Sequence, residues 1–164
     1  MKADSSSSSE AFSHLDEAGR ARMVRVTEKP DQKRRALAEG VLRLAPETVE
    51  RLRRQALPKG DVLSVAQVAG ILGAKKTAEL IPLCHRLPLH HVEVRFRLER
   101  DRIQILGAAE TVGKTGVEME ALTAVAVAAL TLYDMCKAVD KGMSIEGIRL
   151  LKKEKEPAAG GEQS

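Results

Sequence analysis

The sequence predicts one α+β domain in which helices cover one face of an antiparallel sheet. Residues 91–98 and 102–106 alternate apolar and charged side chains across a short charged turn, as a hairpin with one solvated face does. Residues 117–139 contain no Gly or Pro and are bracketed by Gly116 and Gly142, which predicts a long helix. Strands interspersed with helices in this way favour a two-layer α+β arrangement.

Two strands and a helix are predicted before residue 58. Residues 23–27 (MVRVT) alternate and are β-branched, which favours a strand, and residues 41–44 are a second candidate. Pro46 can occupy the first position of a helix, and apolar residues follow it at helical spacing. The arginines at positions 51, 53 and 54 are typical of a solvated face, with a phosphate patch as the alternative.

A second helix is predicted after the turn that Pro58, Lys59 and Gly60 indicate. Asp61 can cap this helix, and its apolar side chains recur at helical spacing at Val62, Val65, Val68 and Leu72. We expect Gly73 to interrupt it and a further turn or two to end near residues 81–82. The final strand candidate is residues 145–151 (IEGIRLL).

The composition indicates a globular protein without a nucleic-acid or membrane partner. The 164 residues suit one domain, and a net charge of +4 is only a mild bias toward anionic ligands. With two Phe, one Tyr and no Trp, the chain offers little surface on which bases could stack. The longest uncharged run, residues 121–133, is too short to cross a bilayer and predicts a buried core helix.

The termini predict the compartment and the domain limits. The polar first residues lack the apolar core of a secretory signal, so we expect a cytoplasmic protein with Cys84 and Cys136 as reduced thiols. We place a serine-rich tail at residues 1–12, a single domain at 13–155 and a second tail at 156–164.

Two motifs are incomplete when their spacing is examined. Gly113, Lys114 and Thr115 look like the end of a phosphate-binding loop, but Ala108 stands where that loop requires its first Gly. Thr115 instead lies three residues before Glu118, which predicts a capping box at the start of the long helix. Cys84, with the histidines at 85, 90 and 91, lacks metal-ligand spacing, so no metal site is predicted.

Three segments of the chain contain candidates for chemistry. The apolar, proline-containing segment 81–85 (IPLCH) would hold the His85 imidazole rigidly, which favours a functional histidine. Asp134 and Lys137 share a helix face, either as a surface ion pair or as a functional pair. Lys59 precedes a helix N-terminus and is either an anion-binding residue or an ordinary turn lysine.

Three stretches of the chain together resemble the MoaC family. They are KGDVLSVAQVAGILGAKKTAELIPLCH, GKTGVEMEALTAVAVAALTLYDMCKAV and IRLL, and the resemblance extends from about residue 11 to about residue 153. It implies a ferredoxin-like subunit that assembles into dimers and then into a hexamer, a trimer of dimers. It also implies a lyase of molybdenum cofactor biosynthesis, which converts 3′,8-cyclo-7,8-dihydroguanosine triphosphate into a cyclic pyranopterin monophosphate and releases diphosphate.

The resemblance implies a set of site residues by position. The catalytic side chains correspond to Asp134, Lys137, Lys59, His85 and Glu120. Further substrate-binding residues correspond to Leu83, Cys84, Met119, Glu118, Arg34 and Lys153. Cations suit a triphosphate, and acids with an imidazole suit proton transfer. No flavin or nicotinamide is expected, and whether Mg²⁺ accompanies the triphosphate stays open.

The chain departs from the family's pattern at two places. Arg25 stands where the family carries an acid, and KKEKEP follows IRLL where the family often has a lysine with nearby glycines, which leaves the position of Lys153 open. The alternative from another class is a non-catalytic ferredoxin-like module that binds a phosphorylated ligand or nucleic acid. An aspartate and a histidine in one pocket with two lysines favour the enzyme.

Helix geometry predicts how the acidic candidates Glu118, Glu120 and Asp134 lie relative to one another. Side chains two positions apart on a helix point about 200° apart, so Glu118 and Glu120 should face different ways, and we expect Glu120 to be the proton carrier. The helical rise places Glu120 and Asp134 about 21 Å apart in one chain. We therefore expect the site at a subunit interface, where antiparallel long helices of a two-fold dimer bring both ends together.

Overall fold

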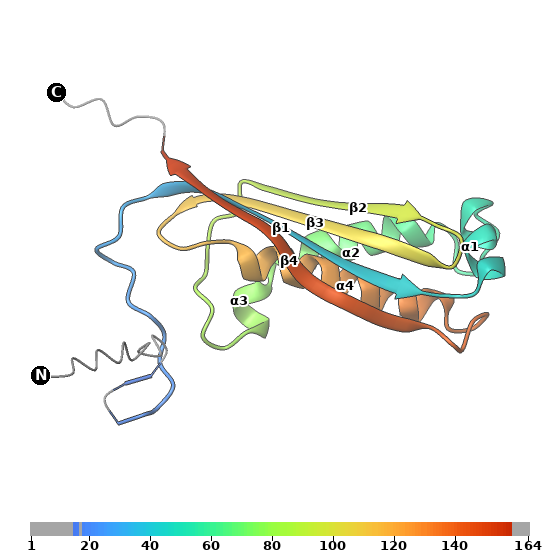
Figure 1. Cartoon of the computed structure of the whole chain (residues 1–164), viewed down its shortest axis with the longest axis horizontal. Coiled ribbons are helices and arrows are strands. Elements are labelled where there is room, and N and C mark those ends of the chain that lie inside the picture. Colours follow the sequence, from blue (N-terminus) through green and yellow to red (C-terminus); the bar gives the residue numbers. More distant parts are fainter. Residues whose placement is uncertain (1–14, 17, 159–164) are drawn as a thin grey trace, which may run out of the picture.

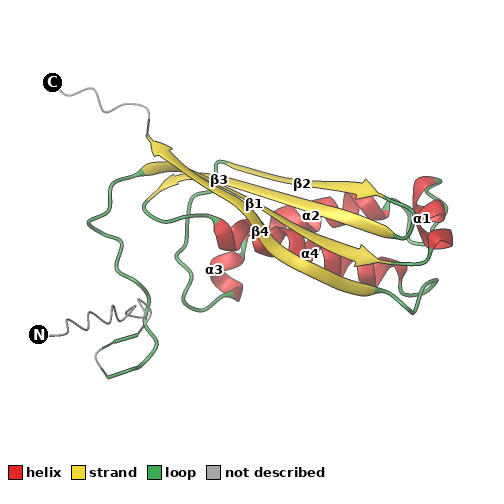
Figure 2. Ribbon diagram, in the orientation of Figure 1, coloured by secondary structure: helices red, strands yellow, loops and turns green. Residues whose placement is uncertain are grey.

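The central layer is a four-stranded antiparallel sheet in the order β2-β3-β1-β4. In this computed structural model, which describes residues 15, 16 and 18–158, the strands are β1 (Gln32–Arg43), β2 (His91–Leu98), β3 (Arg102–Gly113) and β4 (Ser144–Pro157). The helices are α1 (Pro46–Arg53), α2 (Val62–Lys75), α3 (Thr77–Leu80) and α4 (Glu118–Cys136). Helices α2 and α4 lie along one face of the sheet, as Figures 1 and 2 show. The α+β class and the ferredoxin-like arrangement are thus confirmed.

Strand β1 is much longer than the segment predicted at 41–44, and the strand predicted at 23–27 is wrong. Residues 22–26 have no regular structure, because no strand in the described part of the chain lies beside them to pair with. The alternation of large apolar and polar side chains that indicates a strand is weak in β1, because its buried face carries small residues such as Ala36 and Ala38. Small residues are required there: a Cβ on Gly40 would lie 2.8 Å from Val125 Cγ1 of α4.

The predicted interruption of the second helix at Gly73 is also wrong. α2 continues to Lys75, and a Cβ on Gly73 would lie 2.7 Å from Val127 Cγ2. A Cβ on Gly70 would likewise lie 2.8 Å from the Ala124 carbonyl oxygen and 3.2 Å from Ala128 Cβ. Helices α2 and α4 therefore pack against each other through small residues. The large apolar side chains Val65, Val68 and Leu72 consequently face outward, each about half exposed. The further turn predicted to end near residues 81–82 is confirmed as α3, which ends at Leu80. The Asp61 cap is confirmed because its side chain accepts the Ser64 N–H at 3.1 Å.

Strand β4 contains two irregularities that decide which of its side chains face the helices. Around Gly147, whose φ is +58°, the register with β1 shifts between Glu39 and Val41. A second shift between Leu37 and Ala38 places Lys153 opposite buried Ala36, so Lys153 faces the helical layer. β4 also extends to Pro157, two residues into the segment expected to be a tail.

Helix α4 forms the centre of the core, as predicted for residues 121–133. By length and composition it is the one described helix that could cross a membrane, but half of it is buried inside the protein. It packs on the sheet through fully buried residues such as Val125 and Leu132. Cys84 and Cys136 are both free thiols, as expected. The serine-rich tail at 1–12 and residues 159–164 of the second tail lie outside the described residues.

Candidate active site at the two ends of α4

Three predicted residues meet at the C-terminal end of α4. The Lys137 ammonium lies 2.7 Å from Asp134 Oδ1, and the Lys59 ammonium lies 3.4 Å from Oδ2. Lys59 also donates a hydrogen bond to the Asp134 carbonyl oxygen at 3.0 Å, one of the carbonyls that has no partner within the helix. A carboxylate is disfavoured at the negative end of a helix, and the two lysines offset that disadvantage.

The electrostatics of this cluster keep Asp134 ionised. Hydrogen bonding and attraction from Lys137, assisted by Lys59, lower the pKa of Asp134 below its usual value. The same contact with Asp134 raises the pKa of Lys137. All three side chains are about half exposed, so an incoming anion can reach both ammonium groups. The cluster therefore combines two accessible cations with one carboxylate.

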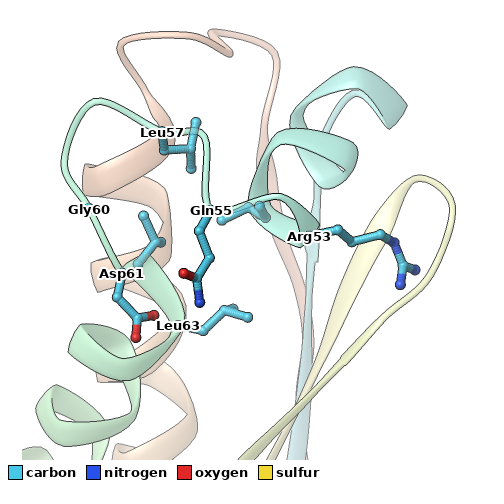
Figure 3. Close-up of a pocket in the computed structure, with 8 residues that line it drawn as sticks. Arg53, Gln55, Leu57, Gly60, Asp61 and Leu63 are labelled. Atoms are coloured by element: carbon cyan, nitrogen blue, oxygen red, sulfur yellow. The ribbon is translucent and has the colours of Figure 1, made fainter.

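The turn that carries Lys59 also borders a small cavity of about 120 Å³ (Figure 3). Figure 3 shows the Gln55 amide directed toward Leu63. Arg53 also lines the cavity, but its guanidinium extends away from the other labelled side chains and donates to the Leu98 carbonyl. The carboxylate of Asp61 is engaged by the Ser64 hydroxyl and N–H at the start of α2. Since none of the predicted site residues lines this cavity, it is the weaker candidate for a functional site.

The remaining predicted residues gather at the N-terminal end of α4. The loop after α3 places Leu83, Cys84 and His85 beside Glu118 and Met119 around a cavity of about 390 Å³. His85 Nε2 lies 2.8 Å from the Val24 carbonyl oxygen, so the imidazole is held in place by the N-terminal segment. The apolar, proline-containing segment 81–85 thus presents its histidine at a cavity.

The capping box predicted for Thr115 and Glu118 is wrong. α4 begins at Glu118 with Val117 as its N-cap, and no side chain caps it. The Glu118 carboxyl folds back over Gly116, where a Cβ would clash with it. Glu118 is therefore free to line the cavity and to contact Lys153, whose ammonium lies 3.5 Å from Oε1.

A second hollow of about 260 Å³ shares Gly116 and Glu118 with the first and is rich in cations. Arg34 lines it and is fixed by hydrogen bonds to the carbonyls of Gly113 and Lys114. Lys153 and Lys155 line it from β4. Lys155 was not predicted as a site residue, because only the register with β1, which places it opposite Arg34, reveals its position.

Glu120 is the buried acid of the site. Only 3% of its surface is exposed, its Oε2 has no partner among the described residues, and its Oε1 accepts from the Cys84 thiol at 3.9 Å. Burial raises the pKa of Glu120, and burial beside Glu120 raises the pKa of the Cys84 thiol. Glu120 borders a third hollow, of about 240 Å³, with Lys75 and Arg86. The two glutamates therefore face different hollows, as helix geometry predicted.

The two clusters lie at opposite ends of α4, and one subunit does not bring them together (Figure 1). The start of the helix has a buried acid, an imidazole and several cations, and the end has a carboxylate between two ammonium groups. Among the described residues, no three His, Cys, Asp or Glu side chains form a group that could hold a metal ion. Together the clusters are equipped to bind an anionic ligand and to move protons.

The fold and these clusters define a ferredoxin-like protein in which carboxyl groups and an imidazole lie near clustered cations. A family model described as the MoaC family matches residues 23–156, and the chain belongs to that family. A cyclic pyranopterin monophosphate synthase of Thermomicrobium roseum is 61% identical over 144 residues, which cover 87% of both chains. Synthases of the same name from Roseiflexus sp. and Peptoclostridium acidaminophilum are 58% and 56% identical and cover 87% of this chain.

Proposed function

We propose that this protein is a cyclic pyranopterin monophosphate synthase, a lyase of molybdenum cofactor biosynthesis. Its substrate would be 3′,8-cyclo-7,8-dihydroguanosine triphosphate and its second product diphosphate. The observation that carries the proposal is the pairing of Asp134 with Lys59 and Lys137 in a chain at least 56% identical over 87% of its length to the named relatives above. Such a substrate needs cations for its phosphates and groups that transfer protons during ring rearrangement.

The end of α4 would act in phosphate binding and proton transfer together. In the free protein both lysines contact Asp134 and lower the pKa of its carboxyl. A triphosphate would compete for the two ammonium groups, because phosphate oxygens carry more charge than one carboxylate. Loss of these contacts would bring the pKa of Asp134 back toward its ordinary value and make it a better proton carrier. Binding would thereby prepare the acid–base group.

The start of α4 would hold the part of the substrate that is rearranged. Glu120 is a buried acid with a raised pKa, so its carboxyl is suited to remain protonated where an exposed carboxyl would not. His85 stands at the adjoining cavity as a second proton carrier. Arg34 and Lys153 supply the cations at this end. Met119, Leu83 and Cys84 would contribute apolar surface and shape.

The complete site would form between two subunits of a homo-oligomer, a hexamer built as a trimer of dimers. Two features support this arrangement. The clusters lie about 21 Å apart along one helix, which one nucleotide cannot bridge with side chains. The outer surface of the helical layer also carries unpartnered apolar residues, with Val68 56% and Leu130 61% exposed, and such a stripe is stabilised when a second copy covers it.

The proposal includes a cytoplasmic location and a reaction without a redox cofactor. The rearrangement and the closure of a cyclic phosphate change no oxidation state, so neither flavin nor nicotinamide is required. Whether Mg²⁺ accompanies the triphosphate is decided by activity after treatment with a chelator and after Mg²⁺ is restored.

The deciding experiment is an assay of diphosphate release from the cyclic dihydroguanosine triphosphate. We expect stoichiometric diphosphate and a cyclic pyranopterin monophosphate, and no product with the Asp134→Ala variant as the matched control. Binding of the triphosphate without any diphosphate release would instead favour a non-catalytic module for a phosphorylated ligand, and the enzyme proposal would fail.

A further inference from the structure

Residues 22–27, which we call the strap, cross the end of the molecule where α4 begins, although they form neither helix nor strand (Figure 1). Two side chains tie the strap to the domain. His85 Nε2 lies 2.8 Å from the Val24 carbonyl oxygen, and the Lys114 ammonium donates to the Thr27 carbonyl oxygen at 2.6 Å. Both side chains come from loops that flank the 390 Å³ cavity.

The chemistry of the first contact fixes the position of a proton. A backbone carbonyl oxygen has no hydrogen and can only accept, so Nε2 of His85 must be the donor. A neutral imidazole carries one N–H, and its other nitrogen then has the lone pair. While the contact exists, the neutral His85 ring is therefore the Nε2–H tautomer, and Nδ1 is the nitrogen able to take a proton.

The surroundings favour a role for this orientation in the site. His85 lines the 390 Å³ cavity with Glu118 and Met119, and no described residue forms a hydrogen bond with Nδ1. A carbonyl that accepts from one ring nitrogen also stabilises the imidazolium formed when the other nitrogen is protonated. The strap thus supplies what a buried carbonyl or carboxylate supplies to a histidine in many enzymes.

We propose that the strap is a positioning element of the active site. The Val24 carbonyl holds His85 with its proton on Nε2, so that Nδ1 faces the substrate. In the reaction, a substrate N–H or O–H gives its proton to the Nδ1 lone pair, and the imidazolium later returns that proton to a departing oxygen or nitrogen. This inference rests on the proposed function, and it adds a role for backbone that the family's site residues do not include.

The test combines neutron crystallography with kinetics. In the deuterated wild type, a ring that carries a single deuteron should have it on Nε2, directed at the Val24 oxygen, and none on Nδ1. Val24→Gly/Val26→Gly removes two partly buried side chains of the strap. Two glycines make the strap more flexible, so this variant should lose the contact and lower kcat about 10- to 100-fold with little change in KM.

The control is Glu28→Gly/Lys29→Gly, which adds two glycines just outside the strap and preserves net charge. We expect wild-type kcat from it. If the first variant fails to fold, an amide-to-ester replacement between Val24 and Arg25 weakens the same carbonyl as an acceptor without altering a side chain, and it should lower kcat in the same way.

Two results would overturn the inference: a neutral His85 with its deuteron on Nδ1, or wild-type kcat in a variant whose crystal structure lacks the contact. A wild-type protein that releases no diphosphate would instead overturn the proposed function, and the neutron structure would still decide the tautomer.

Discussion

Lys59 and Asp134 are 75 residues apart in sequence, yet the Lys59 ammonium donates to the Asp134 carbonyl oxygen at 3.0 Å and lies 3.4 Å from Oδ2. The turn before α2 is thereby joined to the last turn of α4. Lys137, the C-cap residue of α4, approaches the same carboxylate to 2.7 Å from Oδ1. Because the pair is half exposed, it adds little to stability, and its value is more readily explained by the ligand it can bind.

Asp134→Asn preserves the shape of the side chain and removes its charge. If Asp134 transfers protons, the variant should fold and bind substrate but lose about 10²- to 10⁴-fold in kcat. Diphosphate release and equilibrium binding of the triphosphate measure the two effects separately. Unchanged turnover would mean that Asp134 is only the surface partner of the two lysines.

Lys59→Ala should weaken binding of triphosphate ligands much more than binding of the corresponding monophosphates, because the ammonium acts on phosphate charge. Calorimetric titration with GTP and GMP provides the comparison. Lys141→Ala, outside the site, removes an exposed lysine a few residues beyond α4 and should affect neither ligand. An equal loss for both nucleotides in Lys59→Ala would argue against phosphate binding at this position.

Glu120→Ala and Asp134→Ala should complement each other if the site is shared between subunits. After the two inactive variants are unfolded together and reassembled, each mixed dimer holds one doubly altered site and one intact site. With random pairing, about a quarter of all sites are intact, and activity should return to that level. Mixed dimers that form but stay inactive would rule out the shared site.

Glu120→Gln should flatten the dependence of stability on pH. Burial raises the pKa of Glu120 in the folded protein above its ordinary value of 4.5, so between the unfolded and folded pKa values the folded state binds more protons. The free energy of unfolding of the wild type therefore falls as pH rises from about 4.5 through the folded pKa. The free energy of unfolding of Glu120→Gln does not fall in this way, so the variant should be more stable than the wild type at neutral pH.

Urea titrations at a series of pH values measure this difference. Glu79→Gln removes a half-exposed carboxyl instead and should retain the wild-type loss of stability, since Glu120 is still present. If the stability of Glu120→Gln changed with pH in parallel with that of the wild type, burial would not raise the pKa of Glu120 in the folded protein.

Gln55→Gly should stabilise the protein. Gln55 follows the C-cap of α1 with φ of +51°, and the N–H groups of Gln55 and Ala56 bond back to the carbonyls of Leu52 and Arg51. A non-glycine residue is strained in this left-handed conformation, and after the extra chain entropy of glycine a gain of about 0.5–1 kcal/mol should remain. Urea denaturation checks this, with Gln55→Ala as a control that should show no gain.

The sequence by itself determined the features whose energies are local. The alternation in residues 91–98, the Pro46 and Asp61 helix starts and the long helix near 117–139 depend on neighbouring residues, and the structure confirms them. The long shared strings also identified the family. Hydrogen bonds between near neighbours and apolar periodicity are visible in any window of the chain, so these features need no knowledge of the fold.

The tertiary structure decided what depends on partners distant in sequence. Only close contact with α4 explains the Ala and Gly of β1 and the continuation of α2 through Gly73. Only the register shifts of β4 turn Lys153 toward Glu118, and only the later start of α4 releases Glu118 from the expected cap. Packing, register and helix ends depend on the shape of a neighbouring element, which no local window of sequence contains.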